Sequence, residues 1–125
     1  MPLEVNWTDR HSVCFTGNGI VSGAECIKAN RLVIDDPRLP ELRSQLVDLG
    51  AVTDYRISAA ESQTLAEMDK QAARTAAEVK VAMICPSDLV FGMSKIYAAY
   101  TPALWEVRIF RDADAATAWL ATEKR

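Results

Sequence analysis

The chain has 125 residues and a mass of 13.8 kDa, the usual size of one domain with one hydrophobic core. Half of its residues are hydrophobic and 25% are charged, a balance that excludes a disordered, collagenous or membrane-spanning chain. The formal net charge of −3 leaves no basic surface for the phosphates of nucleic acid or for anionic lipid head groups. We therefore predict a single domain over residues 1–125 that neither binds nucleic acid nor inserts into a membrane.

The cysteines indicate the cellular compartment. Cys14, Cys26 and Cys85 are widely separated, contain no Cys-x-x-Cys pair, and each lies in an apolar run, as reduced core cysteines do. The first twenty residues have neither the basic start nor the apolar stretch of a secretory signal. These features predict a reducing, cytoplasmic location and no disulfide, metal site or other cofactor.

Two short strands are predicted at the N-terminus. Apolar residues alternate with polar ones over residues 3–7, and a second run covers residues 12–16, so the two form an antiparallel hairpin. The Gly-Asn-Gly of residues 17–19 follows, and these residue types accept the positive φ of a turn. We therefore expect the second strand to end at Thr16.

A helix and the central strand come next. Ser22 and Glu25 have the spacing of a capping box, which predicts a helix over residues 23–33. The apolar run of residues 44–49 predicts the central strand, with Asp48 near its C-terminal end and a loop after it.

Helices and strands then alternate to the C-terminus. A second capping box, at Ser58 and Glu61, predicts a long helix in a segment that contains no glycine or proline before Val79. The almost continuously apolar residues 79–85 indicate a strand covered on both faces. Caps at Ser87, Asp88 and Asp112 predict two further helices, separated by a strand over residues 105–109.

From the second strand onward, each predicted strand is followed by a helix. This order is typical of right-handed crossovers and a mostly parallel sheet. We predict an α/β fold with about five strands and about four helices. The first strand is antiparallel, and the strands that begin near Gln45, Val79 and Glu106 are parallel.

The same order, with Asp48 ending the central strand and a long helix beginning at Ser58, resembles the STAS domain. This is the SpoIIAA-like fold of bacterial anti-sigma factor antagonists and of the cytoplasmic tails of sulfate transporters. Three stretches are similar to a group of small standalone bacterial STAS-like proteins: QLVDLGAVTDYRIS, VAMICPSDLVFGMSKIY and VRIFRDADAATAWL. The resemblance covers almost the whole chain and implies a regulatory or protein-interaction module without catalytic activity.

The chain departs from the family at its switch. Antagonists of the phosphoswitch type carry Asp-Ser at the start of the second helix, where a partner kinase phosphorylates the serine. The matching residues here are Tyr55-Arg56-Ile57-Ser58, so the preceding aspartate is missing. Ser58 is therefore a candidate phosphorylation site and, by its capping box, a structural cap.

A binding crevice is expected at the carboxyl edge of the sheet, where helix N-termini gather and ligands usually bind. Its predicted lining is Asp48, Thr53, Asp54, Tyr55, Ser58, Pro86, Ser87 and Asp88. The alternative is that these residues act only as caps and turn formers. The single histidine, His11, lies in the predicted hairpin turn, where it does not reach that edge to form a catalytic triad.

The third helix has more large side chains than one buried stripe uses. Leu89, Met93, Ile96 and Tyr100 fill the stripe, which leaves Phe91 and Tyr97. They either pack on a neighbouring helix or form a patch for a protein partner, a second copy of the chain, or a hydrophobic ligand. We expect Tyr97 to be the exposed one, since its hydroxyl can stay in water.

Three function classes remain open. The first is the non-catalytic interaction module, which a flat exposed apolar face would favour. The second is a carrier or sensor of a small hydrophobic or lipid-like ligand, by the similar topology of CRAL-TRIO domains, which a large apolar cavity beneath the third helix would favour. The third is an enzyme, which convergent polar groups in a deep cleft would favour.

Overall fold

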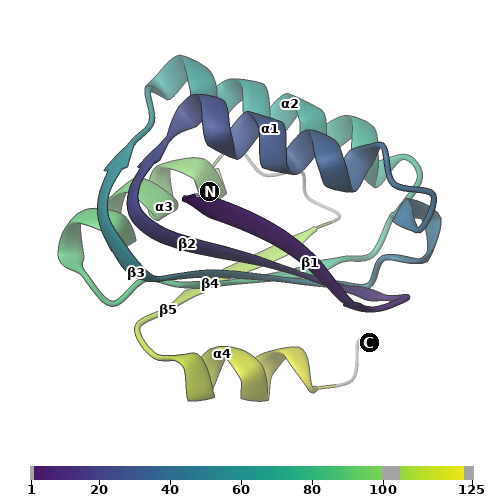
Figure 1. Cartoon of the computed structure of the whole chain (residues 1–125). Helices are drawn as coiled ribbons and strands as arrows, with labels where there is room; N and C mark the ends of the chain where they lie inside the picture. The colour runs from purple at the N-terminus through teal and green to yellow at the C-terminus, as the bar shows by residue number, and fades with distance from the viewer. Residues whose placement is uncertain (1, 100–104, 123–125) are drawn as a thin grey trace.

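The computed structural model describes residues 2–99 and 105–122, without the side chains of residues 89, 93 and 96–99 (Figure 1). The strands are β1 (Leu3–Asp9), β2 (Ser12–Ser22), β3 (Ser44–Arg56), β4 (Lys80–Ile84) and β5 (Glu106–Phe110). The helices are α1 (Gly23–Ile34), α2 (Ala59–Ala73), α3 (Asp88–Ala99) and α4 (Ala113–Leu120), with the 3₁₀ turn η1 (Leu39–Glu41). None of the described helices has the length and apolar character needed to cross a membrane.

The strands form one sheet in the order β1-β2-β3-β4-β5. β1 is antiparallel to β2, and every other neighbouring pair is parallel. Helices α1, α2 and α3 cover one face of the sheet, and α4 covers the other (Figure 1). The predicted α/β fold, with five strands and four helices, is confirmed.

The β2 strand does not end at Thr16 as predicted. It continues through the Gly-Asn-Gly of residues 17–19 to Ser22, and its register against β3 shifts on both sides of this tripeptide. Gly19 has a φ of 63°, a conformation that glycine adopts at little cost. The tripeptide therefore forms an irregularity within a strand instead of a turn.

The β3 strand is also longer than predicted, because it pairs with β2 as far as Arg56, which lies opposite Ser22. Its pairing with β4 stops earlier, where Asp48 lies opposite Ile84. Residues 18–22 and 49–56 thus run beyond the rest of the sheet as a two-stranded ribbon, which curves upward at the left of Figure 1. We call this segment the β2–β3 ribbon.

The α2 helix ends at Ala73, although no glycine or proline occurs before Val79. Ala76 and Val79 beyond it are buried, and the Trp105 indole donates a hydrogen bond of 2.7 Å to the Ala76 carbonyl. Tertiary packing therefore ends this helix where the local sequence would let it continue.

The core has a large part above the sheet and a small part below it. The upper part lies between the sheet and helices α1 to α3, and its fully buried members include Val13, Val21, Leu42, Val79 and Val81. The lower part lies under α4, where Ala82, Ile84 and Ala116 are packed by Leu46, Phe110, Trp119 and Leu120. Because α4 contacts mainly β4 and β5, the lower face of β1 and β2 carries exposed or half-exposed side chains.

Candidate functional site

Ser58 lies exposed at the carboxyl edge of the sheet, where β3 meets α2. Its hydroxyl accepts a hydrogen bond of 3.0 Å from the Glu61 backbone N–H, and the Glu61 carboxylate accepts one of 2.9 Å from the Ser58 N–H. The predicted capping box is therefore present, and it accounts for Ser58 as a helix cap.

The capping box of α1 lies beside that of α2. Ser22 caps α1 through Glu25, and it lies opposite Arg56 in the sheet, so both helices begin at the same edge. A Cβ on Gly23 would collide with the Glu61 carboxyl group. Glycine at this position therefore lets the two helix N-termini approach closely.

The other predicted crevice residues of β3 divide between the two faces of the strand. Thr53 is exposed, and Asp54 forms an ion pair of 2.7 Å with Arg56 on the surface. Asp48 accepts a hydrogen bond of 2.9 Å from the Gly50 N–H, which holds the strand where β4 stops. These side chains face solvent and are placed by an extended strand, not by the predicted loop.

Tyr55 does not line a surface crevice, and this part of the prediction is wrong. Its side chain is only 7% exposed, and its hydroxyl accepts a hydrogen bond from the Cys26 thiol at 3.7 Å. Burial raises the pKa of Tyr55 well above its ordinary value and raises the pKa of Cys26 to about 11. Because β3 continues as a strand, Tyr55 points to the core while Asp54 and Arg56 point away.

The structure adds one feature that the sequence did not indicate. The β2–β3 ribbon exposes Asn18, Ile20, Gly50, Ala51, Thr53 and Arg56, and we call these residues the ribbon surface. Ile20 is 49% exposed, and among the described residues only Leu32 is another large apolar side chain classed as exposed. Because residues 17–19 were expected to form a turn, Ile20 was not expected to lie on a strand beside Asp54.

The start of α3 places Ser87, Asp88 and Phe91 near one another. Ser87 accepts a hydrogen bond of 3.2 Å from the Val90 N–H, and Asp88 forms an ion pair of 2.7 Å with Arg111. The Arg111 guanidinium lies 4.1 Å from the centre of the Phe91 ring and also donates to the Pro86 carbonyl at 3.1 Å. Phe91 is therefore half-buried under a cation.

Tyr97 was predicted to be exposed, and its side chain lies outside the described residues.

A cavity of about 50 Å³ lies beneath α1 and α2. Leu3, Phe15, Cys26, Asn30, Gln45, Val47, Tyr55, Leu65 and Met83 line it. The Gln45 Oε1 atom is buried here with no hydrogen-bond partner among the described residues. Nearby, Asn30 donates a hydrogen bond of 3.1 Å to Asp69 and so links α1 to α2.

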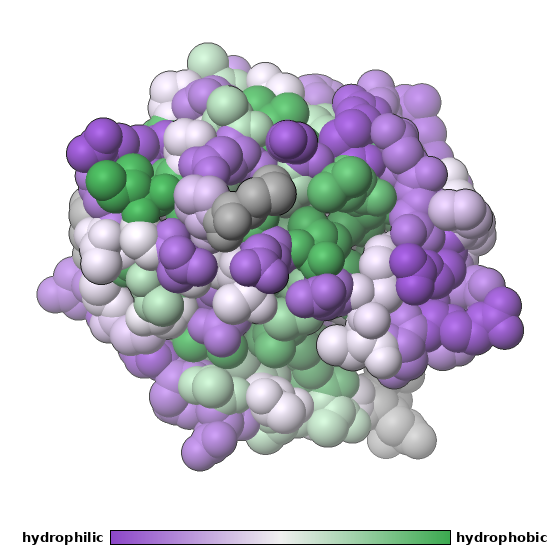
Figure 2. Space-filling model, viewed as in Figure 1, coloured by the Kyte–Doolittle hydropathy of each residue, from purple (hydrophilic) through white to green (hydrophobic). Residues whose placement is uncertain are grey.

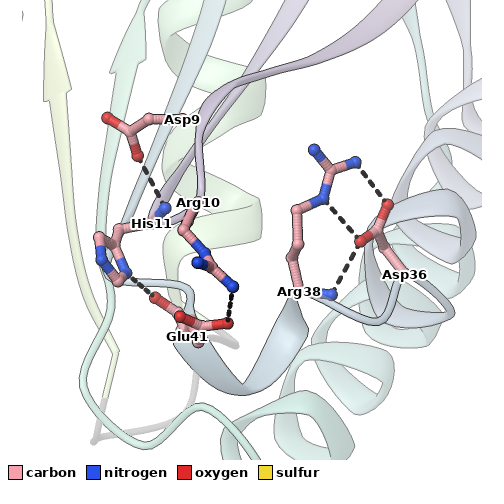
Figure 3. A network of polar contacts seen from close by, with 6 residues as sticks. All are labelled: Asp9, Arg10, His11, Asp36, Arg38 and Glu41. Carbon is pink, nitrogen blue, oxygen red and sulfur yellow. Dashed lines mark hydrogen bonds and ion pairs between the residues drawn. The ribbon is translucent and has the colours of Figure 1, made fainter.

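His11 belongs to a polar network at the opposite, amino edge of the parallel strands (Figure 3). Its Nδ1 atom lies 2.8 Å from the Glu41 carbonyl oxygen, and its backbone N–H donates to Asp9 at 2.7 Å. A separate pair is also drawn in Figure 3, in which hydrogen bonds from Arg38 lower the pKa of Asp36 to about 2. His11 therefore links the β1–β2 hairpin to η1.

Within residues 2–99 and 105–122, no group of three His, Cys, Asp or Glu side chains is arranged to hold a metal ion.

Comparison with known proteins gives the fold. No family model matches the chain, and no curated protein does either. Two solved structures are similar over almost the whole chain. One is an uncharacterized protein of the DUF3478 family from Shewanella loihica PV-4, described as having a SpoIIAA-like fold. It is 16% identical, with a TM-score of 0.58 over 95% of this chain and 92% of that one.

The other is the anti-sigma factor antagonist SpoIIAA in its unphosphorylated form, 9% identical with a TM-score of 0.61 over 93% of this chain and 94% of that one. The chain has a SpoIIAA-like fold. The STAS resemblance predicted from the sequence is thereby confirmed in its architecture. In this SpoIIAA-like chain, Ser58 is the serine that caps the start of α2. It lies at the carboxyl edge next to the ribbon surface.

Proposed function

We propose that this chain is a non-catalytic regulatory module of the STAS type that acts by binding a protein partner. The observation that carries the proposal is the ribbon surface, where Ile20 lies 49% exposed among polar side chains at a projecting end of the sheet. Protein interfaces have an apolar centre and a polar rim, and Ile20 with its polar neighbours has this arrangement.

The proposed contact surface extends from the ribbon surface to α3. Its proposed residues are Asp48, Thr53, Asp54, Ser58, Ser87, Asp88, Phe91 and Tyr97. Hydrogen bonds and ion pairs hold five of these side chains, which favours a preformed surface that changes little on binding: Asp48, Asp54, Ser58, Ser87 and Asp88. An anti-sigma factor antagonist with the same fold supports a regulatory role.

The histidine and the cysteines support a non-catalytic role and a reducing setting. His11 is engaged at the edge opposite Ser58, so the histidine has no access to a serine nucleophile at the carboxyl edge. Cys14, Cys26 and Cys85 are free thiols, which supports a reducing, cytoplasmic setting. We include no cofactor in the proposal.

Phosphorylation of Ser58 would change this surface strongly. A phosphate there would lie at the N-terminus of α2, where the helix dipole favours an anion. It would also meet the Glu61 carboxylate, which now accepts a hydrogen bond from the Ser58 N–H at 2.9 Å. Modification would therefore break the capping box and add charge beside the ribbon surface, so Ser58 is the proposed point of regulation.

The test uses two matched variants on different surfaces. The tagged protein is expressed in its own host, stoichiometric partners are identified by native mass spectrometry, and the purified partner is titrated by calorimetry. We expect Ile20→Asp to weaken the complex by about tenfold or more, while Leu32→Asp leaves the affinity for a monovalent partner unchanged. Absence of a stoichiometric protein partner, or equal binding by Ile20→Asp, contradicts the proposal.

The cavity under α1 and α2 favours a second candidate, the carrier of a small amphipathic ligand. Its walls are mostly apolar, and Gln45 Oε1 offers one unused acceptor. Its volume of about 50 Å³ is a third of the roughly 150 Å³ that holds a benzene molecule, so a larger ligand requires α1 and α2 to move apart. Titration with 1-octanol and octane tests this candidate. Preference for the alcohol that disappears in Gln45→Met supports it, and no binding of either compound contradicts it.

A further inference from the structure

The β1 strand forms one edge of the sheet, and the outer side of its backbone has no strand beside it among the described residues. The Asn18 N–H donates to the Pro2 carbonyl at 2.8 Å, and Glu4 and Asn6 lie opposite Thr16 and Cys14. In an antiparallel pair, hydrogen-bonded residues alternate with residues whose backbone groups point away. The N–H and C=O groups of Leu3, Val5 and Trp7 therefore point outward.

This edge has little of the usual protection against pairing with another strand. Soluble proteins protect edge strands with charged side chains, lysine above all, with proline or with bulges. Between Leu3 and Trp7, β1 has one such feature, the single charge of Glu4, and its register shifts only between Trp7 and Asp9. The other edge strand, β5, carries the charged pair of Glu106 and Arg108. The two edges of the sheet thus differ, and β1 is the one able to accept a further strand.

An apolar groove lies next to this open edge. Leu3, Glu4, Val5 and Leu32 line a groove of about 300 Å³ between β1 and α1. Leu32 is 54% exposed, although it lies in a helix whose other face is buried. Figure 2 shows the corresponding apolar patch right of centre, where α1 passes β1. The edge therefore offers both unpaired backbone groups and an apolar surface.

We infer that the occupant of this edge is a second copy of the same chain, joined through antiparallel pairing of the two β1 strands. With the two-fold axis at Val5, Val5 faces Val5 of the other copy, and Leu3 faces Trp7. This register uses every outward N–H and C=O of the three residues. The apolar side chains of both strands then lie on one face, beside Leu32 of both copies.

The charges along β1 favour this arrangement. Around the axis at Val5, Glu4 of one copy faces Asn6 of the other, so no like charges lie directly opposite. A parallel, in-register copy would instead bring Glu4 against Glu4 and Asp9 against Asp9. An isologous two-fold contact also closes on itself, which limits the assembly to a dimer.

The test places like charges across the axis without touching the core. Asn6 is exposed, so Asn6→Asp leaves the fold intact and sets the introduced carboxylate against Glu4 twice in each dimer. We expect the dimer dissociation constant, measured by sedimentation equilibrium, to rise by roughly tenfold. Adding Glu4→Lys to Asn6→Asp restores opposite charges and should restore the affinity. Leu32→Glu should weaken the dimer to a similar extent.

The control is Gln71→Glu, the same charge change at an exposed position on α2, away from β1. It should leave the dimer unchanged. In hydrogen exchange, the amides of Leu3, Val5 and Trp7 should become protected as protein concentration increases. A protein that stays monomeric up to high micromolar concentration, or a dimer unaffected by Asn6→Asp and Leu32→Glu, overturns the inference. Neither outcome decides whether a different protein binds the ribbon surface, so the two proposals can fail separately.

Discussion

Lys80 is the residue whose removal tests how α4 is held on the sheet. Its side chain is buried below β4, at 6% exposure, although lysine is rarely buried without partners. The ammonium donates to the Trp119 carbonyl at 3.2 Å and to the Thr122 carbonyl at 2.9 Å. It also lies 5.1 Å from the centre of a Trp119 ring. Lys80 thus caps the C-terminus of α4 from the neighbouring strand.

The expected cost of Lys80→Met follows from these contacts. α4 has only eight residues, so it depends on tertiary contacts for stability. Hydrogen bonds from a charged group contribute about 1.5–3 kcal/mol, and a cation at a partly buried helix C-terminus contributes up to about 2 kcal/mol. Lys80→Met also removes the free-energy cost of burying a charged ammonium, which offsets part of this loss. We expect a loss of about 2–3 kcal/mol, equivalent to a fall of roughly 10 °C in the unfolding midpoint for a chain of this size.

Urea unfolding and amide exchange measure this prediction. The exchange rates of α4 should increase more than those of α1 and α2, because Lys80 contacts only α4 among the described helices through its ammonium. Lys70→Met is the matched control. Lys70 is exposed and pairs with Glu67 at 3.5 Å, so its loss should cost less than about 0.5 kcal/mol. Equal stability of Lys80→Met and Lys70→Met would refute the reasoning, because it would mean that apolar packing alone holds α4.

Four further predictions concern single residues. In calorimetry, Ser58→Ala should lower the free energy of unfolding by about 1 kcal/mol, and Ser58→Asp, which still caps α2, should lower it hardly at all. Equal losses would contradict a capping role for Ser58. Gly17→Ala should cost about 1–3 kcal/mol in urea unfolding, because its Cβ would lie 2.9 Å from a Val52 methyl group; an unchanged midpoint argues against close packing. Because burial raises the pKa of Cys26 from 9.0 to about 11, the unfolded state loses its proton first, and stability should fall by about 2 kcal/mol between these pH values. Cys26→Ala should reduce that slope, and an identical slope would assign it elsewhere. Tyr97→Ala should weaken partner binding by more than about 1 kcal/mol with little change in unfolding, whereas a stability loss of about 3–5 kcal/mol would place Tyr97 in the core.

The starts of the helices could be predicted because their signals are local. Ser22 and Ser58 each form the capping box that their spacing indicates, and Asp112 caps α4. Each cap depends on residues three positions apart, so no knowledge of the tertiary structure is needed. The alternation of these helices with apolar runs then predicts the parallel sheet.

The ends of the elements depend on contacts that the local sequence does not contain. The Gly-Asn-Gly of residues 17–19 has the composition of a turn, yet it continues β2 because β3 lies alongside as a partner. Similarly, α2 ends because Ala76 and Val79 enter the core and Trp105 binds the Ala76 carbonyl. Both differences arise from residues far apart in sequence.

The longer strands also explain why the candidate site was only partly predicted. In a loop, Thr53, Asp54 and Tyr55 could all face one crevice, but in a strand successive side chains face opposite sides. Tyr55 is therefore buried while Asp54 faces outward. Thr53 is the extra residue where the register against β2 shifts between Gly19 and Ile20, and it is exposed near Ile20, which no motif singled out. A strand prediction that extended through residues 17–22 would have placed Ile20 on the surface by the same alternation.

The two exposed large apolar side chains of the described residues lie on different surfaces, and this separation makes the two proposals independent. Ile20 is on the β2–β3 ribbon, which projects because β4 ends at Ile84 while β3 continues to Arg56. Leu32 is on α1 beside β1, at an outer edge of the sheet. A dimer through β1 leaves the ribbon of each copy open, so one assembly can present two partner-binding surfaces. If both proposals hold, Leu32→Asp lowers partner affinity only when the partner is multivalent, because it removes the avidity of the dimer and no direct contact.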